Sequence, residues 1–192
     1  MQRIVLASNN KHKIKEFKEI LNQYEIVSMS DIGFHDEIEE TGTTFEENSM
    51  IKAKTIFDFL KKQKESMMVI ADDSGLCCKA LNNEPGVMSA RYGGNHDNQA
   101  NRDKLRKELQ GKNRDAFFVC CITLIKEDES IMQFIGKTEG EIVDEERGDT
   151  SFGYDCIFYS LDLKKTFGEA TEEEKNRVSH RSRAVQQLVD AL

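Results

Sequence analysis

The stretch MMVIADDSGL, residues Met67–Leu76, decides how the rest of this chain is interpreted. Its apolar run, Met68–Ala71, has the length of one buried strand. Two adjacent carboxylates follow, Asp72 and Asp73. The next residues, Ser74–Gly75, favour a sharp turn and a close approach of the backbone to a ligand. We therefore predict a strand that ends at the acidic pair.

The acidic pair has two interpretations. In an open α/β sheet, ligands bind just beyond the carboxyl ends of the strands. Two carboxylates at such a place can hold a hard cation such as Mg²⁺, or one of them can accept a proton from water. A solvated acidic turn explains the same residues, because turns favour Asp, Ser and Gly. On this stretch alone both interpretations stay open.

The composition narrows the class of protein. A chain of 192 residues with 38% hydrophobic content suits one domain, residues 1–192, with a substantial core and room for two lobes. No apolar run approaches the roughly 20 residues of a membrane span, and we expect neither a signal peptide nor membrane binding. A formal charge of −8 argues against a nucleic-acid polymer as partner. None of the five cysteines has C-x-x-C spacing, so we expect reduced thiols in a cytoplasmic protein.

The N-terminal segment reads as strand, polar turn and helix. Arg3–Ala7 is a buried strand, Ser8–Asn10 breaks it, and apolar residues at helical spacing predict a helix over Lys11–Asn22. Backbone N–H groups and the helix dipole make such a turn an anion site, to which Lys13 adds a full charge. The other interpretation is that Ser8 or an Asn only caps the helix.

Glu25–Ser28 is a candidate second strand, and a further helix begins after Thr44. Thr44 and Glu47 match a capping box, in which the Glu side chain closes the start of the helix. The apolar stripe of this helix, which runs to about Lys62, is formed by Met50, Ala53, Phe57 and Leu60. The local pattern favours capping over metal binding for Glu47.

The segments after the acidic pair predict a mixed central sheet flanked by helices. Leu76–Leu81 is a candidate strand, and Asp97 caps a helix that ends near Gln110. Ala116–Ile125 is apolar on both faces and is therefore a central strand. Ile131–Ile135 returns as an antiparallel hairpin, which Glu139–Val143 continues or restarts. This order predicts an α/β body of two lobes with an active-site cleft between them.

The loop RGDTSFGYD, Arg147–Asp155, places two aromatic rings among polar residues. A ring at Phe152 or Tyr154 can stack on a nucleobase, and Asp155 can accept a hydrogen bond from a base N–H. The other interpretation is that the aromatic residues anchor the loop in the core while Asp155 caps a turn.

Basic residues gather at the junction of two predicted C-terminal helices. Thr171 opens a second capping box, and Ser179 is the predicted cap of the last helix. Lys175, His180 and Arg181 surround this junction. Cations in the first turn of a helix are disfavoured by its dipole, so these residues need a partner such as an anionic or carbonyl-bearing ligand. A solvated basic patch is the alternative.

Taken in order and spacing, the segments SNNKHK, ADDSG, SFGYD and KNRVSHR resemble the inosine triphosphate pyrophosphatase family, also called the Ham1 or RdgB-type family. The resemblance covers essentially the whole chain and includes TFEENSMIKA, PGVMSARYGG and TFGEATEEEKNRVSHR. It implies the two-lobed fold of inosine triphosphatases and hydrolysis of ITP, dITP and XTP to the monophosphate and pyrophosphate. It also implies Mg²⁺ as cofactor and a homodimer.

The resemblance also implies roles for particular residues. Asp73 is the implied proton acceptor, and the implied magnesium ligands are Glu47, Asp72 and Asp73. Phe152 is implied to stack on the base, while Lys175, His180 and Arg181 read it. Substrate binding is implied for Ser8, Asn9, Asn10, Lys11, His12, Lys13, Ser74, Phe152, Gly153, Tyr154, Asp155, Lys175, His180 and Arg181. Cationic donors favour the acceptor at C6 of inosine and xanthine over the amine of adenine, whereas guanine must be rejected at its C2 side.

Two positions depart from the family pattern, which commonly has Gly at Asn9 and Pro at Cys156. Asn tolerates a positive φ, but the loss of Pro makes the aromatic loop less rigid and affects base selectivity more than chemistry. Two other functions compete. A Maf-like pyrophosphatase with another base preference is opposed by the KNRVSHR segment, and a nucleotide-binding regulator without turnover is opposed by the Asp72 and Asp73 pair.

Overall fold

The computed structural model describes all residues from Met1 to Leu192. The chain divides into two compact units. The first comprises Met1–Asp73, Cys120–Ile135 and Ala184–Leu192, and the second comprises Ser74–Val119 and Gly136–Arg183. The prediction of one domain with a cleft between two lobes stays a prediction.

The predicted α/β fold with a mixed sheet flanked by helices is confirmed. The strands are β1 (Arg3–Leu6), β2 (Glu25–Ser28), β3 (Met68–Cys78), β4 (Asp115–Ile125), β5 (Ile131–Ile142), β6 (Phe158–Ser160) and β7 (Lys165–Thr166). The helices are α1 (Lys11–Ile20), α2 (Phe45–Lys62), α3 (Asn98–Glu108), α4 (Glu172–Val178) and α5 (His180–Val189). The seven strands form one sheet in the order β2-β1-β3-β4-β5-β6-β7. β1 is parallel to β2 and β3, whereas β6 is antiparallel to β5 and β7.

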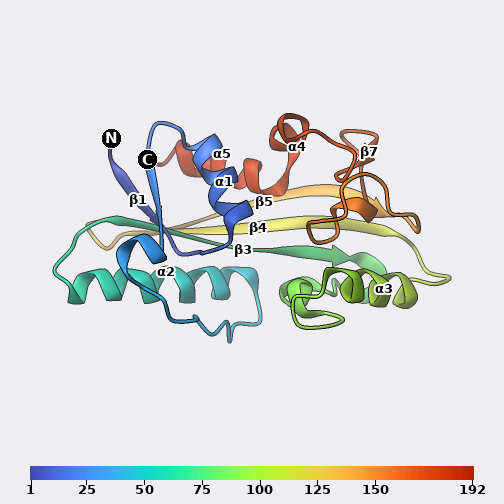
Figure 1. The fold of residues 1–192 in the computed structure, drawn as a ribbon, viewed down its shortest axis with the longest axis horizontal. Coiled ribbons are helices and arrows are strands. Elements are labelled where there is room, and N and C mark those ends of the chain that lie inside the picture. The colour runs from blue at the N-terminus through green and yellow to red at the C-terminus, as the bar shows by residue number, and fades with distance from the viewer. The chain divides into compact units, whose positions relative to one another are not determined.

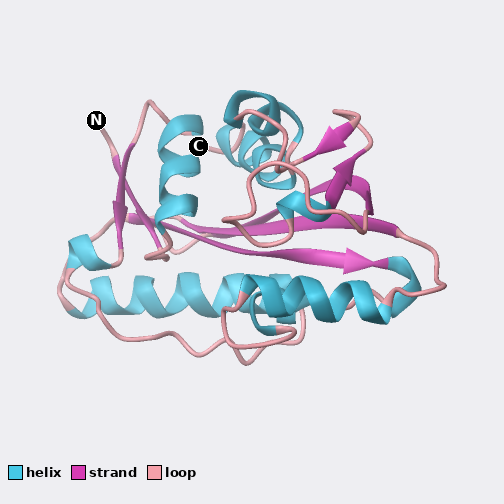
Figure 2. Cartoon of the chain, turned by 45° about the vertical axis from the view of Figure 1, so that its right-hand side comes forward, coloured by secondary structure: helices cyan, strands magenta, loops and turns pink.

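In the first unit, helices cover both faces of the β1 and β3 strands. Leu6 pairs with Ile70 in the β1–β3 register, and both side chains pack with α1 and the end of α5. Val5 and Val69 point to the opposite face, where they pack with α2. Figures 1 and 2 show α1 and α2 on opposite sides of these strands. Both faces are covered, so these strands are apolar without alternation.

The prediction that a strand ends at Asp72 is wrong. β3 runs for 11 residues through the acidic pair and Ser74–Gly75 and ends at Cys78. The first half of the candidate strand Leu76–Leu81 is therefore its continuation, whereas Lys79–Leu81 forms a 3₁₀ helix. Both carboxylates are buried, and each forms an ion pair with a lysine from another element. A buried carboxylate is tolerated inside a sheet when a cation pairs with it, and local turn propensity cannot reveal such a partner.

The predicted central strand and its hairpin are confirmed. The turn after β4 is closed by Lys126 N–H donating to the Ser130 carbonyl at 2.9 Å. At the other end, Ile142 N–H donates to the Arg114 carbonyl at 3.0 Å, so the strands run antiparallel. β5 is uninterrupted, which shows that Glu139 continues the strand rather than restarting it.

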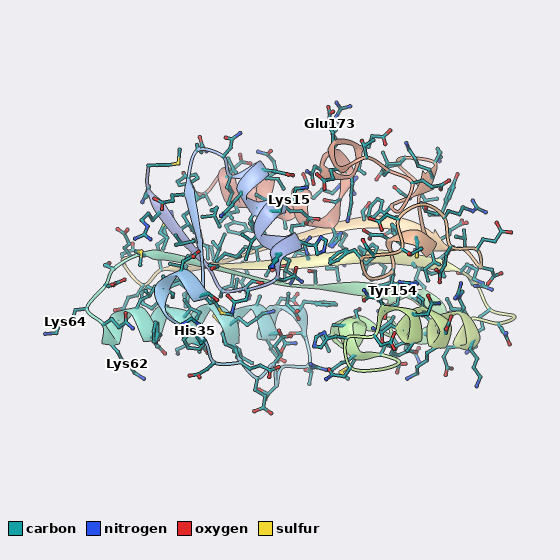
Figure 3. The ribbon with its side chains drawn as sticks, viewed as in Figure 1. Lys15, His35, Lys62, Lys64, Tyr154 and Glu173 are labelled. Carbon is teal, nitrogen blue, oxygen red and sulfur yellow. The ribbon has the colours of Figure 1, made fainter.

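The predicted N-cap of α2 is confirmed, but its predicted apolar stripe is rotated. Thr44 Oγ1 accepts a hydrogen bond from Glu47 N–H at 3.1 Å. Met50 and Phe57 are only half-buried. The buried face carries Asn48, Ser49, Lys52, Ala53, Ile56 and Leu60. Lys62 and Lys64 at the opposite end project outward (Figure 3). None of the helices combines the length and the apolar character that crossing a membrane requires.

The five cysteines are free thiols and all are buried. Burial raises the pKa of Cys77 to about 11 and that of Cys78 to about 12. At pH 8 about one Cys77 in a thousand is then a thiolate, the form that reacts. We expect no rapid reaction of the folded protein with Ellman's reagent at pH 8 and five equivalents after unfolding in guanidinium. A fast equivalent in the folded protein would contradict this burial.

Candidate active site

The polar turn before α1 is tied together by its own side chains. Asn10 Oδ1 accepts from His12 N–H at 3.0 Å and from Lys13 N–H at 3.3 Å, so Asn10 caps the helix. Ser8 Oγ accepts from Asn10 N–H at 3.1 Å. Of the two interpretations of this turn, capping describes the structure as it stands. Lys11 and His12 are exposed on α1.

Asn9 uses its side chain rather than a special backbone conformation. Its Oδ1 accepts from Ser30 N–H at 3.1 Å and from Ser30 Oγ at 2.9 Å. The residues with positive φ do not include Asn9. The position where the family commonly has Gly therefore holds Asn without strain, and the Asn adds a link to the next loop.

The acidic pair is held by two lysines from different helices. Lys13 of α1 lies 3.0 Å from Asp72, whose side chain is fully buried. Lys52 of α2 lies 3.4 Å from Asp73 and 2.9 Å from Glu40, and only 9% of the Lys52 side chain is exposed. The sheet thus presents its two buried carboxylates to two ammonium groups in the first unit.

The sequence interpretation missed Lys52 and Glu40. Lys52 lies in the segment TFEENSMIKA, but the resemblance implied no role for it, and Glu40 lies in an acidic loop. One signal was available: the polar residues Asn48 and Lys52 repeat at the four-residue spacing of the apolar Ile56 and Leu60. Polar residues that continue a buried stripe are unusual, and they point to a polar site beneath the helix.

The pKa of the Asp73 carboxyl group is raised, which suits a proton acceptor. Burial raises the pKa of its carboxyl group, and the nearby Glu40 carboxylate adds to this rise while the Lys52 ammonium opposes it. The pKa of Lys52 is raised as well: burial opposes this, but the surrounding carboxylates outweigh it. A carboxyl group with a raised pKa is a stronger base than an ordinary one once it is deprotonated.

The carboxylate of Asp73 also has a free position. Its Oδ2 is buried and has no hydrogen-bond partner, although the Asn48 amide is close enough to lower the pKa of the group. A buried carboxylate oxygen without a partner suits a hard cation, and Mg²⁺ commonly takes one or two carboxylates with water and phosphate as its other ligands. No group of three or more His, Cys, Asp or Glu side chains is assembled as a complete metal cage.

Glu47 is engaged at the start of α2. Its side chain is exposed, and Oε2 accepts from Thr43 N–H at 2.6 Å and from Thr43 Oγ1 at 3.0 Å. These hydrogen bonds lower the pKa of Glu47. The structure therefore shows the capping role, displaced by one residue from the predicted box, and the role as metal ligand stays a prediction.

The second unit gathers the predicted base-reading residues. Lys175 lies 2.6 Å from Asp155 and 5.2 Å from the centre of the Phe152 ring. Tyr154 packs in the core, and its hydroxyl donates to the Ser89 carbonyl at 2.7 Å. Figure 3 labels Tyr154 in the loop between β5 and β6. Of the two aromatic residues, Phe152 is thus the half-buried one, whereas Tyr154 anchors the loop.

The predicted cap and the two basic residues at the start of α5 are also in place. Ser179 Oγ accepts from Ser182 N–H at 3.1 Å, which confirms the cap. Arg181 is buried and donates from NH2 to Ser74 Oγ at 3.1 Å. The His180 ring stacks on Phe118 with centroids 4.9 Å apart. Arg181 and Ser74 were both predicted to bind substrate, and the structure brings these two side chains into contact.

The fold and these buried polar groups define an α/β enzyme in which strand β3 presents a lysine-paired acidic site. The chain belongs to the Ham1 family, whose model matches residues 4–191. This confirms the family resemblance inferred from the sequence.

Similar proteins match over almost the whole chain. The dITP/XTP pyrophosphatase of Bacillus subtilis is 45% identical over 198 residues, which cover 100% of this chain and 98% of that protein. The dITP/XTP pyrophosphatase of Clostridium perfringens is 44% identical over 199 residues, with the same coverage. The solved structure of the Staphylococcus aureus Ham1 protein superposes with a TM-score of 0.88 at 42% identity, covering 99% of this chain and 97% of that one.

Proposed function

We propose that this protein hydrolyses the non-standard purine nucleoside triphosphates ITP, dITP and XTP to the monophosphate and pyrophosphate. The observation that carries the proposal is the match over essentially the full chain to proteins named dITP/XTP pyrophosphatase, at 44–45% identity. The geometry agrees, because a buried carboxylate with a raised pKa stands beside two lysines in the first unit. Such a group combines a base with charges that attract phosphate.

Asp73 accepts a proton from the water that attacks the α-phosphorus. Lys13 and Lys52 approach the triphosphate as point charges and offset its negative charge. Lys52 also holds Asp73 in place, and its second partner, Glu40, keeps the ammonium charge at the site when Asp73 takes up the proton. Ser8, Asn10 and the other residues of the polar turn contact the phosphates.

The cofactor is a divalent metal, as is general for nucleoside triphosphate pyrophosphatases, and we infer that it is Mg²⁺. Asp73 would hold the ion through its unpaired oxygen, with Asp72 as the neighbouring carboxylate and Glu47 as the further predicted ligand. Glu40 is an additional candidate, because it already shares Lys52 with Asp73. When bound, the ion supplies positive charge to the phosphates and to the leaving pyrophosphate.

Residues of the second unit recognise the base. Phe152 stacks on the purine, with Gly153, Tyr154 and Asp155 shaping the pocket. Lys175 and Arg181 donate hydrogen bonds to the oxygen at C6, whereas the amine of adenine would leave these donors unpaired. Asp155 pairs with Lys175 and so orients its ammonium group. Ser74 contacts the substrate, and His180 completes the set.

The remaining expectations concern the setting of the enzyme. We propose that it acts in the cytoplasm as a homodimer on free nucleotides, without a nucleic-acid polymer or a membrane as partner. Its net charge of −8 agrees with this, because a basic footprint is absent and cations are concentrated locally.

The deciding experiment is pyrophosphate release from ITP, XTP, GTP, ATP and dCTP, each with Mg²⁺ and with chelator. We expect fast, metal-dependent release from ITP and XTP only. Release from other nucleotides instead would favour a Maf-like enzyme and discard the base-reading roles of Lys175, His180 and Arg181. If none of these nucleotides releases pyrophosphate, a nucleotide-binding regulator without turnover would explain the site better.

A further inference from the structure

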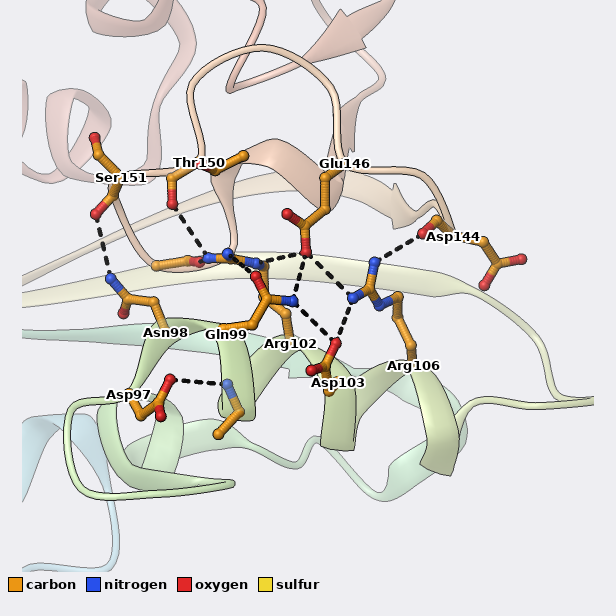
Figure 4. A network of polar contacts seen from close by, with 12 residues as sticks. Asp97, Asn98, Gln99, Arg102, Asp103, Arg106, Asp144, Glu146, Thr150 and Ser151 are labelled. Carbon is orange, nitrogen blue, oxygen red and sulfur yellow. Dashed lines mark hydrogen bonds and ion pairs between the residues drawn. The ribbon is translucent and has the colours of Figure 1, made fainter.

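Arg102 of α3 is a buried arginine that holds the loop between β5 and β6. Only 3% of the residue is exposed. Its NH1 donates to two backbone carbonyls of the loop, that of Gly153 at 2.8 Å and that of Thr150 at 3.3 Å. Its Nε donates to Glu146 Oε1 at 3.1 Å. Figure 4 shows this guanidinium beneath the loop. A buried charged side chain is rare, and this one is satisfied chiefly by the segment that it holds.

The ends of the loop are fixed by other means. Asp149 N–H donates to the Gly168 carbonyl at 2.8 Å, and Gly168 N–H donates to the Asp155 carbonyl at 2.9 Å. The middle of the loop depends on α3 instead. Asn98, one helical turn before Arg102, donates from Nδ2 to the Ser151 carbonyl at 3.2 Å. Residues four apart share one face of a helix, so this face of α3 binds three carbonyls of the loop.

The contact requires the shape of arginine. The planar guanidinium presents donors in a fixed fork, whereas lysine offers one point charge that cannot span several acceptors in the same way. Gln99 completes the arrangement by accepting from Arg102 NH2 at 2.9 Å and donating to Glu146 at 3.0 Å. Burial opposes ionisation of Glu146, but the hydrogen bonds from Gln99 and Arg102 lower its pKa, so it faces Arg102 as a carboxylate.

The segment held by Arg102 carries the proposed base-stacking ring. Phe152 lies between the carbonyls that Arg102 and Asn98 bind, and its ring faces Lys175. The hydrogen bonds from α3 therefore reach the backbone on both sides of this ring, at Ser151 and at Gly153.

We propose that Arg102 is the positioning residue of the base-binding loop: by holding the carbonyls of Thr150 and Gly153, it fixes Phe152 for stacking on the purine. This inference rests on the proposed function, in which Phe152 binds the base. Arg102 itself acts through the loop, so it governs how well the base is bound and discriminated. The chemical step depends on Asp73 and its lysines, which belong to the other unit.

The test is steady-state kinetics of Arg102→Lys with Arg106→Lys as matched control. Arg106 lies one turn further along α3 and shares Glu146, but it binds the Asp144 carbonyl instead of Thr150 and Gly153. For Arg102→Lys we expect KM for ITP to rise about tenfold, because a small displacement of a binding group weakens binding strongly. We expect kcat to stay within about threefold, and the ITP over GTP ratio of kcat/KM to fall about tenfold. Arg106→Lys should resemble the wild type in all three quantities.

Hydrogen exchange of the loop provides a measurement that does not need activity. Amides of Arg147–Asp155 should exchange faster in Arg102→Lys than in the wild type or in Arg106→Lys, while β4 stays protected. Asn98→Ala removes the side chain that donates to the Ser151 carbonyl of the same loop. This second variant provides a test of the proposal if Arg102→Lys does not fold. It should change KM and loop exchange in the same direction, by a smaller factor.

Three results would separate the two proposals. An unchanged KM, base preference and loop exchange in Arg102→Lys would overturn the positioning role and leave the proposed function intact. If Arg102→Lys does not fold, wild-type values for Asn98→Ala would overturn it. A wild type that releases no pyrophosphate would refute the proposed function, and loop exchange would still show whether Arg102 restrains the loop.

Discussion

In the variant Asp73→Asn, we expect kcat for ITP to fall by about 10²–10⁴-fold, the range that a lost general base produces. Asparagine keeps the shape of the side chain but cannot accept a proton at neutral pH. The buried carboxylate with its raised pKa is thereby removed, while Lys52 keeps Glu40 as its partner. The measurement is pyrophosphate release at saturating ITP and Mg²⁺.

The control for this variant is Asp58→Asn, which changes an exposed carboxylate on α2. It should retain wild-type kcat and melting temperature. Asp73→Asn should also melt cooperatively, since Lys52 keeps Glu40 as its partner and the neutral amide adds no unpaired charge. Activity above half of the wild-type value in a folded Asp73→Asn protein would remove Asp73 from the chemistry.

We expect the largest loss of stability from the substitution Lys52→Met. The substitution keeps the length of the side chain but leaves Asp73 and Glu40 without their shared cation. Breaking a buried ion pair by removing one partner costs about 3–5 kcal/mol. For a chain of this size we expect a melting temperature lower by roughly 10 °C at pH 8.

The pH dependence of that loss follows from Asp73. Its pKa in the folded protein is already raised by burial, and removing the ammonium raises it further. A carboxyl group with a raised folded-state pKa binds its proton more tightly in the folded state, so stability falls as the pH rises through that pKa. The difference from the wild type should therefore be smaller at pH 5 than at pH 8.

Lys54→Met on the exposed side of α2 is the matched control for Lys52→Met. Surface substitutions of this kind usually change the free energy of unfolding by less than about 0.5 kcal/mol. Equal melting temperatures for Lys52→Met and the wild type, measured by calorimetry at pH 8, would show that the ion pairs of Lys52 do not support the fold.

Much of the fold could be predicted because its signals are local. Thr171 and Glu174 form a full capping box where the sequence places one, since both partners lie within one helical turn. β4 was predicted within one residue at its start, because a strand covered on both faces is apolar without interruption. The end of β3 was predicted wrongly, because the lysines that pair with Asp72 and Asp73 come from distant elements and leave no local signal.

The sequence predicted which residues belong to the candidate site, but not which of them contact one another. Asp155 and Lys175 were both expected at the base, and they meet across 20 positions of sequence. Their contact with each other follows from the packing of α4 against the loop, and no motif encodes it. Tyr154 shows the same limit, since pattern alone could not tell a stacking ring from the core anchor that it is.

Periodicity, caps and turns along the chain were therefore enough to predict an α/β fold, and the resemblance of its motifs predicted the Ham1 family to which the chain belongs. The tertiary structure alone decided that β3 passes through the acidic pair, that Lys52 joins Asp73 to Glu40, and that Arg102 holds the aromatic loop. The physical reason is that buried charge is stable only where an opposite charge or a carbonyl is brought to it. In each case that partner lies at least 12 residues away in sequence, so folding has to supply it.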